Sequence, residues 1–428
     1  MILYKGKVYE TSCQRWLLDH LEEDINDTRV NKKLDITKVI TAVDALGKKL
    51  ARGEYDEQIA RLDMEGIKEQ LDTVIQMVKR ENLDYRLSLE LPEHQESKDV
   101  IKSRVLPLGT LFHIAAGNMD GLPAYSVIEG LLTGNINILK LPQADQGLSI
   151  EILQALIETE PSITDFIYVF DTPSSDLEAM KKMASVSDGI VTWGGDEAVS
   201  AVRRFAGPGT KLIEWGHRLS FAYLSGWKEL APEIFEREIK GLADHIMSTR
   251  QLLCSSCQVI YLDTEDMEQV HEFCRVFLPY LEKAAERFPA ASMGMRAEIS
   301  LRRYCDTLNK IILEEETEES RIYGGKGCSL TACEDKELEL SDMFGNCLVK
   351  RLPAKEMMTV LRRKKGCLQT AGLICKEQKR EELAGLLAAC GVVRIMRAGH
   401  MSKTFLGEAH DGEYPLRRYV RIVDIETE

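Results

Sequence analysis

The sequence has 428 residues, of which 44% are hydrophobic and 29% charged, a composition typical of a globular enzyme of two or three domains. Its formal net charge of −14 excludes nucleic-acid binding through the overall electrostatic field. There is no apolar run as long as a signal-peptide core or a membrane span, and the cysteines have no framework spacing, which is typical of a reducing cytosol. We therefore expect a cytoplasmic protein without a membrane span.

Residues 1–98 are predicted to form a mostly helical region. Apolar residues recur at helical spacing from Ile36 to Leu50, where Asp35 is a suitable N-cap, and again from Ile67 to Val78. These segments carry no motif that is typical of catalysis. We expect the helices to pack on the outside of the domain that follows.

Residues 99–225 are predicted to form a nucleotide-binding domain. The expected strands are 110–116, 136–139, 166–170, 190–192, 211–213 and 221–224, and the expected helices are 123–132, 148–157 and 196–204, with a further helix opened by a capping box at 175–178. Strands that alternate with helices of this length imply a parallel sheet covered on both faces. Ligands bind such sheets beyond the carboxyl ends of the strands.

Glycines and polar residues follow these strand ends. The stretch from Gly117 to Gly121 follows the first strand, Lys140 ends the second, and Gly194 and Gly195 follow the fourth. Glycines that open a helix let a phosphate approach backbone N–H groups at the positive end of the helix dipole. Each of these motifs alone is more often a simple turn, but together they indicate a nucleotide site.

Residues 226–395 are predicted to form a second α/β domain, which contains the candidate nucleophile Cys254. A helix with one apolar face precedes this cysteine, and the β-rich run from Val259 to Leu262 follows it. A thiol at such a junction is held rigidly and can still face a cleft. The alternatives are a packing cysteine, or a redox pair or half of a zinc site with Cys257. Because no further cysteine pair has suitable spacing, we expect no metal. Residues 396–428 are expected to supply a return strand and an oligomer contact.

Seven landmarks occur in the order found in the aldehyde dehydrogenase superfamily. They are Pro107-Leu-Gly109, Asn118, Gly134-Asn-Ile-Asn-Ile-Leu-Lys140, Trp193-Gly194-Gly195, Glu214-Trp-Gly216-His217, Gln251-Leu-Leu-Cys254-Ser and Asp342-Met-Phe-Gly345. The stretch from Gly216 to Tyr223 and the run around Cys254 most resemble its acyl-CoA reductase branch, the luminescence fatty-acid reductase (LuxC) family. The resemblance covers about residues 100–425. It implies an α/β fold with a Rossmann-like, parallel-sheet cofactor domain and a second α/β catalytic domain.

The resemblance also implies catalytic roles. Cys254 would attack an acyl thioester and form a thioacyl-enzyme, and the amide of Asn118 with the backbone N–H of Cys254 would bind the oxyanion. Glu214 aligns with the general base of the oxidising dehydrogenases, and in a thioester reductase it would activate Cys254 or be structural. His217 is a second candidate base. If Cys257 also faces the cleft, oxidation would join it to Cys254 and switch the enzyme off.

The cofactor residues follow from the same resemblance. Lys140 would contact the adenosine ribose, Gly194 and Gly195 would line the dinucleotide, and Asp342 stands where the superfamily usually has a glutamate for the nicotinamide ribose. Gln143 replaces another usual glutamate. Since a carboxylate there would repel a 2′-phosphate, its absence favours NADPH over NADH.

The predicted activity is therefore the NADPH-dependent reduction of a long-chain fatty acyl thioester to the aldehyde. The donor is acyl-CoA or an acyl-protein supplied by a synthetase or transferase partner, and the resemblance suggests a homo-oligomer. An oxidising aldehyde dehydrogenase and an acyl phosphate reductase remain as alternatives of the same fold. A non-catalytic acyl-binding or scaffold subunit is an alternative of another class, although such a protein would not need Asn118, Lys140 and Cys254 together.

Overall fold

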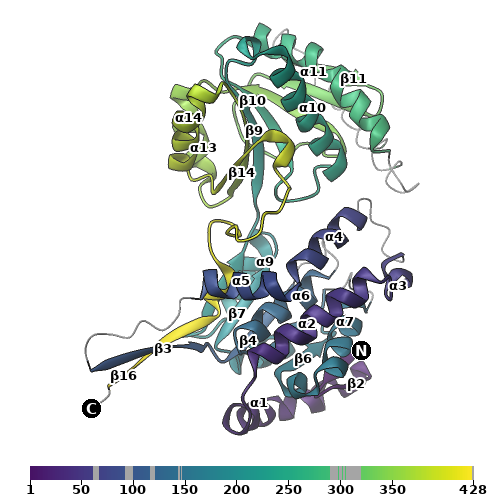
Figure 1. Ribbon diagram of the computed structural model, residues 1–428, viewed down its shortest axis with the longest axis vertical. Helices are drawn as coiled ribbons and strands as arrows, with labels where there is room; N and C mark the ends of the chain where they lie inside the picture. The colour runs from purple at the N-terminus through teal and green to yellow at the C-terminus, as the bar shows by residue number, and fades with distance from the viewer. Residues whose placement is uncertain are drawn as a thin grey trace. The chain divides into compact units, whose positions relative to one another are not determined.

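The computed structural model describes residues 1–60, 67–91, 100–115, 121–142, 145, 147–289, 297, 301, 304 and 320–426. The chain divides into two compact units (Figure 1). The first takes Met1–Leu62, Ile67–Gly216 and Phe405–Glu428, and the second takes His217–Thr404. Both ends of the chain therefore contribute to the first unit.

The first unit is built on a seven-stranded sheet with the order β2-β1-β6-β5-β4-β7-β8. Its strands are β1 (Ile2–Tyr4), β2 (Lys7–Tyr9), β4 (Thr110–Ile114), β5 (Ile136–Lys140), β6 (Ile167–Phe170), β7 (Gly189–Trp193) and β8 (Lys211–Trp215). The strands β6, β5, β4, β7 and β8 are parallel. From β4 the chain first adds β5 and β6 on one side, and then returns to add β7 and β8 on the other side of β4. Ligands of such sheets bind at this switch point, beyond the carboxyl ends of β4 and β7.

Six helices of the first unit, α2, α4, α6, α7, α8 and α9, lie where helices were predicted. The helices of this unit are α1 (Gln14–Asn31), α2 (Ile36–Ala51), α3 (Asp56–Ala60), α4 (Ile67–Met77), α5 (Arg80–Glu90), α6 (Leu122–Leu132), α7 (Leu148–Thr159), α8 (Leu177–Ser185), α9 (Asp196–Phe205) and α15 (Pro415–Arg418). Asp35 caps α2 as predicted, because its side chain accepts a hydrogen bond from the Thr37 N–H. The predicted capping box of α8 is wrong by one residue, since Asp176 caps the helix by accepting from the Ala179 N–H.

A hairpin at the start of the chain extends the sheet. β1 pairs antiparallel with β6 and with β2, and Tyr4 faces Lys7 across the two-residue turn. Lys5 and Gly6 both have positive φ, of 48° and 71°, which is the backbone of a type I′ turn. The sequence prediction of a mostly helical start missed this hairpin, because its strands have only three residues each.

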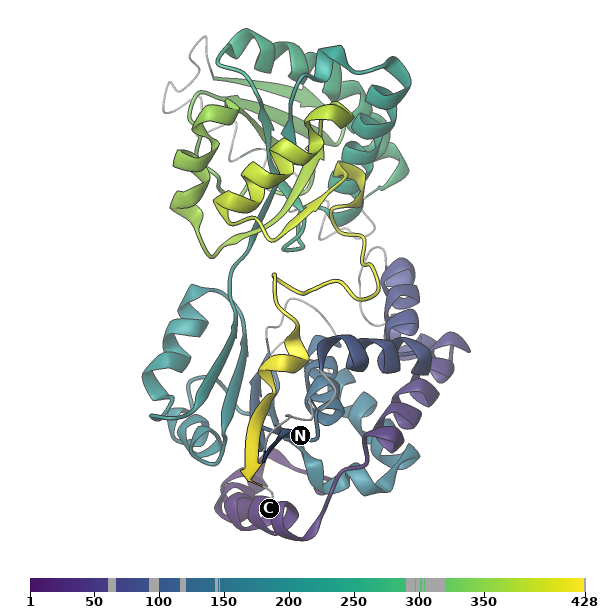
Figure 2. The same ribbon diagram turned by 60° about the vertical axis from the view of Figure 1, so that its left-hand side comes forward.

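A two-stranded ribbon joins distant parts of the chain. β3 (Ile101–Pro107) and β16 (Val420–Glu426) pair antiparallel along their whole length, from Pro107 opposite Val420 to Ile101 opposite Glu426. In Figure 1 the ribbon reaches away from the main sheet of the first unit, and in Figure 2 β16 is the yellow arrow that ends near the C-terminus. The strand expected near the C-terminus therefore exists, and its partner is in the same chain.

The second unit contains another seven-stranded sheet, with the order β11-β12-β13-β10-β9-β14-β15. Its strands are β9 (Leu219–Leu224), β10 (Cys257–Leu262), β11 (Arg321–Gly325), β12 (Cys328–Cys333), β13 (Asn346–Arg351), β14 (Leu368–Ile374) and β15 (Arg394–Met396). All are parallel except β11, which runs against β12. β9 was expected to close the nucleotide-binding sheet, but it pairs with β10 and β14 in the second sheet. A short apolar run predicts a buried strand, but it does not indicate which strands lie beside it.

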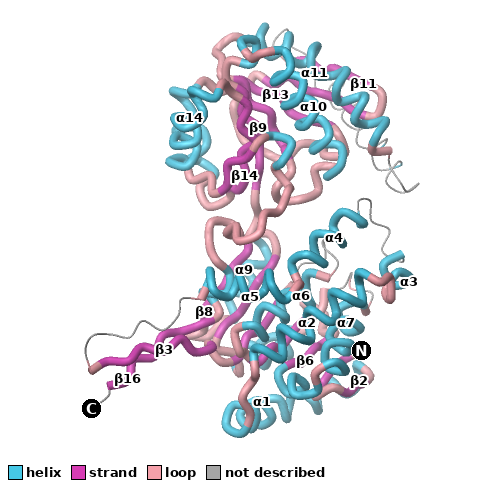
Figure 3. The backbone as a smooth tube through the Cα atoms, in the orientation of Figure 1, coloured by secondary structure: helices cyan, strands magenta, loops and turns pink. Residues whose placement is uncertain are grey.

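Helices cover both faces of this second sheet. α10 (Pro232–Thr249) and α11 (Met267–Arg287) pack on one face, and α13 (Met357–Leu361) and α14 (Glu377–Cys390) pack on the other (Figure 3). Short 3₁₀ helices lie at Thr11–Cys13, Pro161–Phe166, Trp227–Glu229, Ala354–Glu356, Arg362–Lys364 and Ala398–His400. The predicted α/β class is confirmed, and the sheets of both units are mainly parallel. Within the described part of the chain, we find no helix with the length and apolar character needed to cross a membrane.

Candidate active site

Cys254 lies in the turn between α10 and β10, at the amino-terminal ends of the parallel strands of the second sheet. Its side chain is exposed. The Oγ of Ser220, on β9, donates to the Cys254 carbonyl oxygen at 2.7 Å, and the Nε2 of Gln369, on β14, donates to the Cys254 Sγ at 3.3 Å. The thiol is thus accessible while its residue is fixed by two neighbouring strands.

The backbone before Cys254 leaves the helix in an uncommon conformation. Arg250 and Gln251 have φ values of 51° and 63°, in the left-handed region that non-glycine residues rarely adopt. Gln251 is 1% exposed, and its side-chain Nε2 donates to the Cys257 carbonyl oxygen at 2.9 Å. A buried amide therefore closes the turn and compensates for the lost helical hydrogen bonds.

The Asp342-Met-Phe-Gly345 motif contacts this same turn. The Phe344 N–H donates to the Arg250 carbonyl oxygen and the Gly345 N–H donates to Gln251 Oε1, both at 2.9 Å. The motif was expected to place Asp342 on a cofactor ribose. The contacts of its backbone give it a second role that the sequence did not indicate, which is to brace the turn that carries the candidate nucleophile.

His245, on the buried face of α10, contacts the backbone at the end of the turn. Its Nε2 accepts a hydrogen bond from the Cys257 N–H at 3.3 Å. Burial, with a further contribution from the charge of Arg394, lowers the pKa of His245 to about 4. The imidazole is therefore neutral at physiological pH, which leaves Nε2 able to accept. Sequence reasoning missed His245, although its place among the apolar residues of α10 was a signal.

Cys257 is a core residue. Its side chain is fully buried at the start of β10, where burial raises the pKa of the thiol to about 12. The condition for a disulfide switch, that Cys254 and Cys257 both face the cleft, is therefore not met. Among the described residues, no cluster of three or more histidine, cysteine, aspartate or glutamate side chains is arranged to hold a metal ion.

Glu214 is engaged in an ion pair. Both of its carboxylate oxygens accept from Arg203 on α9, from Nε and from Nη2, each at 2.6 Å. This contact raises the pKa of Arg203. A general base needs a carboxylate oxygen that is available to a water molecule, so this arrangement does not favour such a role for Glu214. His217 is half-buried in the segment between β8 and β9.

The candidate cofactor residues of the first unit lie at the carboxyl ends of its parallel strands. Lys140 ends β5, is 4% exposed, and donates from Nζ to Ser174 Oγ at 2.9 Å. Burial lowers the pKa of Lys140. Gly195 is the N-cap of α9, and a Cβ atom at this position would meet no atom within 4 Å, so the space in front of the helix is open.

The structure does not bring all predicted residues into one unit. Lys140, Gly194 and Gly195 belong to the first unit, whereas Cys254 and Asp342 belong to the second. Asn118 and Gln143 lie outside the described residues.

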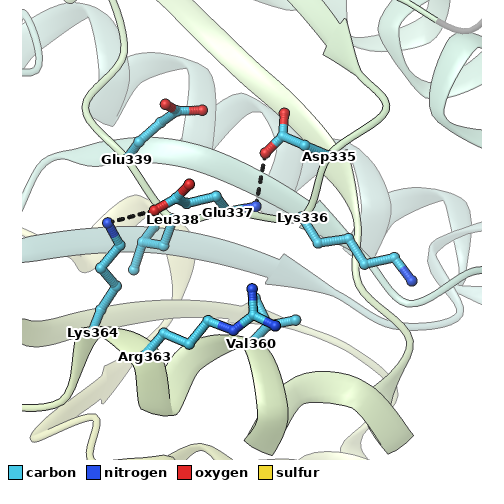
Figure 4. A pocket seen from close by; sticks show the side chains of 8 residues that line it. All are labelled: Asp335, Lys336, Glu337, Leu338, Glu339, Val360, Arg363 and Lys364. Carbon is cyan, nitrogen blue, oxygen red and sulfur yellow. Dashed lines mark hydrogen bonds and ion pairs between the residues drawn. The ribbon is translucent and has the colours of Figure 1, made fainter.

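A separate cavity in the second unit contains none of the predicted residues. It has a volume of about 320 Å³ and is lined by Asp335, Lys336, Glu337, Leu338, Glu339, Val360, Arg363 and Lys364 (Figure 4). Lys350, which is fully buried on β13, donates to Asp335 at 2.6 Å and to Glu339 at 2.5 Å. Burial alone would lower the pKa of Lys350, but these two hydrogen bonds outweigh it and raise the pKa. The two contacts of Lys350 fix residues 335–339, which lead into the Asp342–Gly345 motif.

The sequence matches the family described as acyl-CoA reductase (LuxC) over residues 31–422. The chain belongs to this family. The chain is 25% identical to the long-chain acyl-protein thioester reductase of Vibrio harveyi over 331 residues, which are 76% of this chain and 65% of the relative. For the enzyme of the same name from Aliivibrio fischeri the identity is 24%, over 75% of this chain and 64% of the relative. The chain thus matches less than two thirds of the length of these LuxC relatives.

Solved structures show the fold of this LuxC family member. Betaine aldehyde dehydrogenase from Staphylococcus aureus in complex with NAD+ gives a TM-score of 0.68 at 14% identity, covering 100% of this chain and 93% of that one. Glyceraldehyde-3-phosphate dehydrogenase GapN from Methanocaldococcus jannaschii, complexed with NADP, gives 0.67 at 14% identity, covering 98% and 95%. The predicted aldehyde dehydrogenase-like fold and the resemblance to the LuxC family are confirmed.

Proposed function

We propose that this protein is a nicotinamide-dependent reductase that converts a long-chain fatty acyl thioester into the aldehyde through a thioacyl intermediate on Cys254. The observation that carries this proposal is the exposed Cys254 thiol on a braced turn, with an amide donor at its sulfur, in a chain of the LuxC family. The names of the relatives support the substrate class. The donor is acyl-protein or acyl-CoA.

The chemistry requires a nucleophile and an oxyanion site. The Cys254 thiolate attacks the thioester carbonyl carbon, and the carbonyl electron pair moves to the oxygen, for which Asn118 and the Cys254 backbone N–H are the proposed donors. The carbon–sulfur bond of the donor then breaks, and its electron pair leaves with the donor sulfur, which takes up a proton. Reduction of the thioacyl group by hydride would give the oxyanion of a thiohemiacetal. An electron pair of this oxygen then re-forms the carbonyl as the carbon–sulfur bond breaks, which returns an electron pair to Sγ and releases the aldehyde.

The residues present fit a nicotinamide dinucleotide. The strand order of the first sheet, the open space in front of Gly195 and the buried amino group of Lys140 suit a nucleotide with its phosphates near α9. When bound, this cofactor supplies the hydride. We propose NADPH, from the glutamine at position 143, with NADH as the alternative. Lys140, Gly194, Gly195 and Asp342 are the proposed contacts.

The remaining features of the proposal concern partners. An acyl-protein donor would be supplied by a synthetase or transferase partner, and we propose a homo-oligomer in the cytoplasm. Glu214 would be structural, because its pairing with Arg203 occupies both carboxylate oxygens. A thioester reductase has no need of a deacylating water, and excluding that water protects the aldehyde.

The first test is NADPH oxidation by the purified protein with a long-chain acyl-CoA, with aldehyde identified as the product. Cys254→Ala should reduce the rate by at least about 100-fold, because the covalent route is lost. Cys257→Ala is the matched control and should stay within about threefold of wild type, since this thiol packs in the core. Equal rates for Cys254→Ala and wild type would refute the thioacyl mechanism. Turnover of added aldehyde with NADP+, without any thioester-dependent reaction, would favour the oxidising dehydrogenase.

A further inference from the structure

We propose that Gln369 is a catalytic residue, whose side-chain amide donates a hydrogen bond to the Cys254 thiolate. Its role in turnover rests on the proposed function, whereas its effect on the thiol does not. Gln369 is the second residue of β14 and is 6% exposed. Its Nε2 lies 3.3 Å from the Cys254 Sγ. Because the cysteine itself is exposed, this donor reaches the sulfur from the protein side and leaves the solvent side to a substrate.

An irregularity in the sheet places Gln369 at the sulfur. The pairing of β14 with β9 shifts register between Leu368 and Ala371, and the residues between these points include Gln369. Such bulges re-aim side chains and are common next to active sites. The Val393 N–H donates to the Gln369 carbonyl oxygen at 3.2 Å, so the backbone remains fixed although the ladder is interrupted.

A second contact ties the same part of β14 to Cys254. The Thr370 N–H donates to Ser220 Oγ at 3.1 Å, and Ser220 Oγ donates in turn to the Cys254 carbonyl oxygen at 2.7 Å. Ser220 and Thr370 are both fully buried. The strand therefore holds the backbone of the cysteine through a serine while it contacts the sulfur through Gln369. This double attachment distinguishes the contact from that of a mobile surface side chain.

The chemistry of an amide suits this position. Hydrogen bonds to an ionised acceptor are about twice as strong as those between neutral groups, so the Gln369 N–H favours the thiolate over the thiol. The thiolate is the nucleophilic form of cysteine. The same donor stabilises the thiolate that departs when the thiohemiacetal breaks down. An amide has no proton to transfer at neutral pH, so it does not convert the departing sulfur into a thiol.

Two basic side chains near the turn, His245 and Arg394, have other contacts. His245 lies buried beneath the turn, where its Nε2 accepts from the Cys257 N–H, and Arg394 acts electrostatically on His245. Because an amide does not titrate, Gln369 remains a hydrogen-bond donor over the whole working pH range. Sequence reasoning missed Gln369, because a single polar residue at the start of an apolar strand is usually a boundary signal.

The test measures alkylation of Cys254 by iodoacetamide as a function of pH, in the full chain without thioester or nicotinamide, with the labelled peptide identified by mass. Gln369→Met keeps the size of the side chain and removes the donor, and Gln369→Glu places a carboxylate against the sulfur. Gln378→Met, on the exposed surface of α14, is the matched control. Gln369→Met should move the midpoint of the profile up by about one pH unit and slow labelling at pH 7 about tenfold. Gln369→Glu should raise the midpoint of the alkylation profile further, and Gln378→Met should have the same midpoint as the wild type.

Profiles of both Gln369 variants within twofold of wild type would overturn the proposal. If Gln369→Met fails to fold by thermal unfolding, the isosteric Gln369→Glu decides alone. The two proposals fail separately. Thioester turnover that depends on Cys254, with no change in alkylation, removes the role of Gln369 and keeps the proposed function. A shifted alkylation profile without thioester turnover removes the proposed function and keeps the effect of Gln369 on the Cys254 thiol.

Discussion

Replacing His245 by glutamine should make the second unit less sensitive to acid. A glutamine Oε1 can take the place of the imidazole Nε2 that accepts from the Cys257 N–H, but glutamine does not titrate. The pKa of His245 is lowered by burial from 6.5 to about 4 in the folded protein. Because the unfolded chain binds the proton first as the pH falls, stability is present above pH 6.5 and is lost between about pH 6.5 and pH 4.

The magnitude follows from these two pKa values. At pH 5 the wild-type protein should have lost about 2 kcal/mol of unfolding free energy relative to pH 8 through His245, and at pH 4 about 3 kcal/mol. His245→Gln should lack this loss. The difference in unfolding free energy between pH 8 and pH 5 should therefore be about 2 kcal/mol smaller in the variant than in the wild type.

Urea unfolding at the two pH values, read by pulsed hydrogen exchange on peptides from β10, measures this quantity for the second unit. The first unit provides an internal control. His113 on β4 is also buried and has its pKa lowered to about 4, so peptides from β4 should keep the same acid sensitivity in both proteins. Equal pH dependence of β10 in wild type and His245→Gln, within about 0.5 kcal/mol, would refute the reasoning.

Three further substitutions test other parts of the structure. Glu214→Gln should leave thioester reduction within about threefold of wild type, whereas loss of a general base would reduce the rate at least about 100-fold in steady-state kinetics. Lys350→Met should change the unfolding free energy in urea by less than about 1 kcal/mol, because its two carboxylate partners are half-exposed and stay hydrated; a loss above about 3 kcal/mol would contradict this. Gly130→Ala should lower the free energy of unfolding by about 2 kcal/mol or more, since its Cβ would lie 1.7 Å from Asn137 Oδ1; an unchanged or raised melting temperature would count against the clash.

The sequence predicted the elements of the first unit well where each signal was local. β5, α6, α7 and α9 lie within two residues of their expected bounds, because a buried parallel strand is a short apolar run and the helices between strands have a clear period. The turn that carries Cys254 was also predicted, from a helical pattern that gives way to a β-rich run. By contrast, the sheet to which β9 belongs depends on pairing with distant strands, and no local pattern carries that information.

The roles of the supporting residues were missed for the same reason. Gln251, Gln369 and His245 act through contacts with residues that are close in space. Gln251 stood in the predicted motif without a role of its own, and Gln369 resembles an ordinary boundary residue in the sequence. The brace by Phe344 and Gly345 depends on two short left-handed segments that meet. A motif can indicate that a cysteine is reactive, but the groups that hold it are visible only after the chain has folded.

The ribbon of β3 and β16 has a consequence for the order in which the protein folds during synthesis. β16 follows β3 by more than 300 residues along the chain, and at about 5–20 residues per second the ribosome needs roughly 15–65 s to make the chain between them. The described residues of the second unit all come from His217–Thr404, so this unit has all its strands before the first unit receives β16. We therefore expect the first unit, although it is begun first, to be completed last.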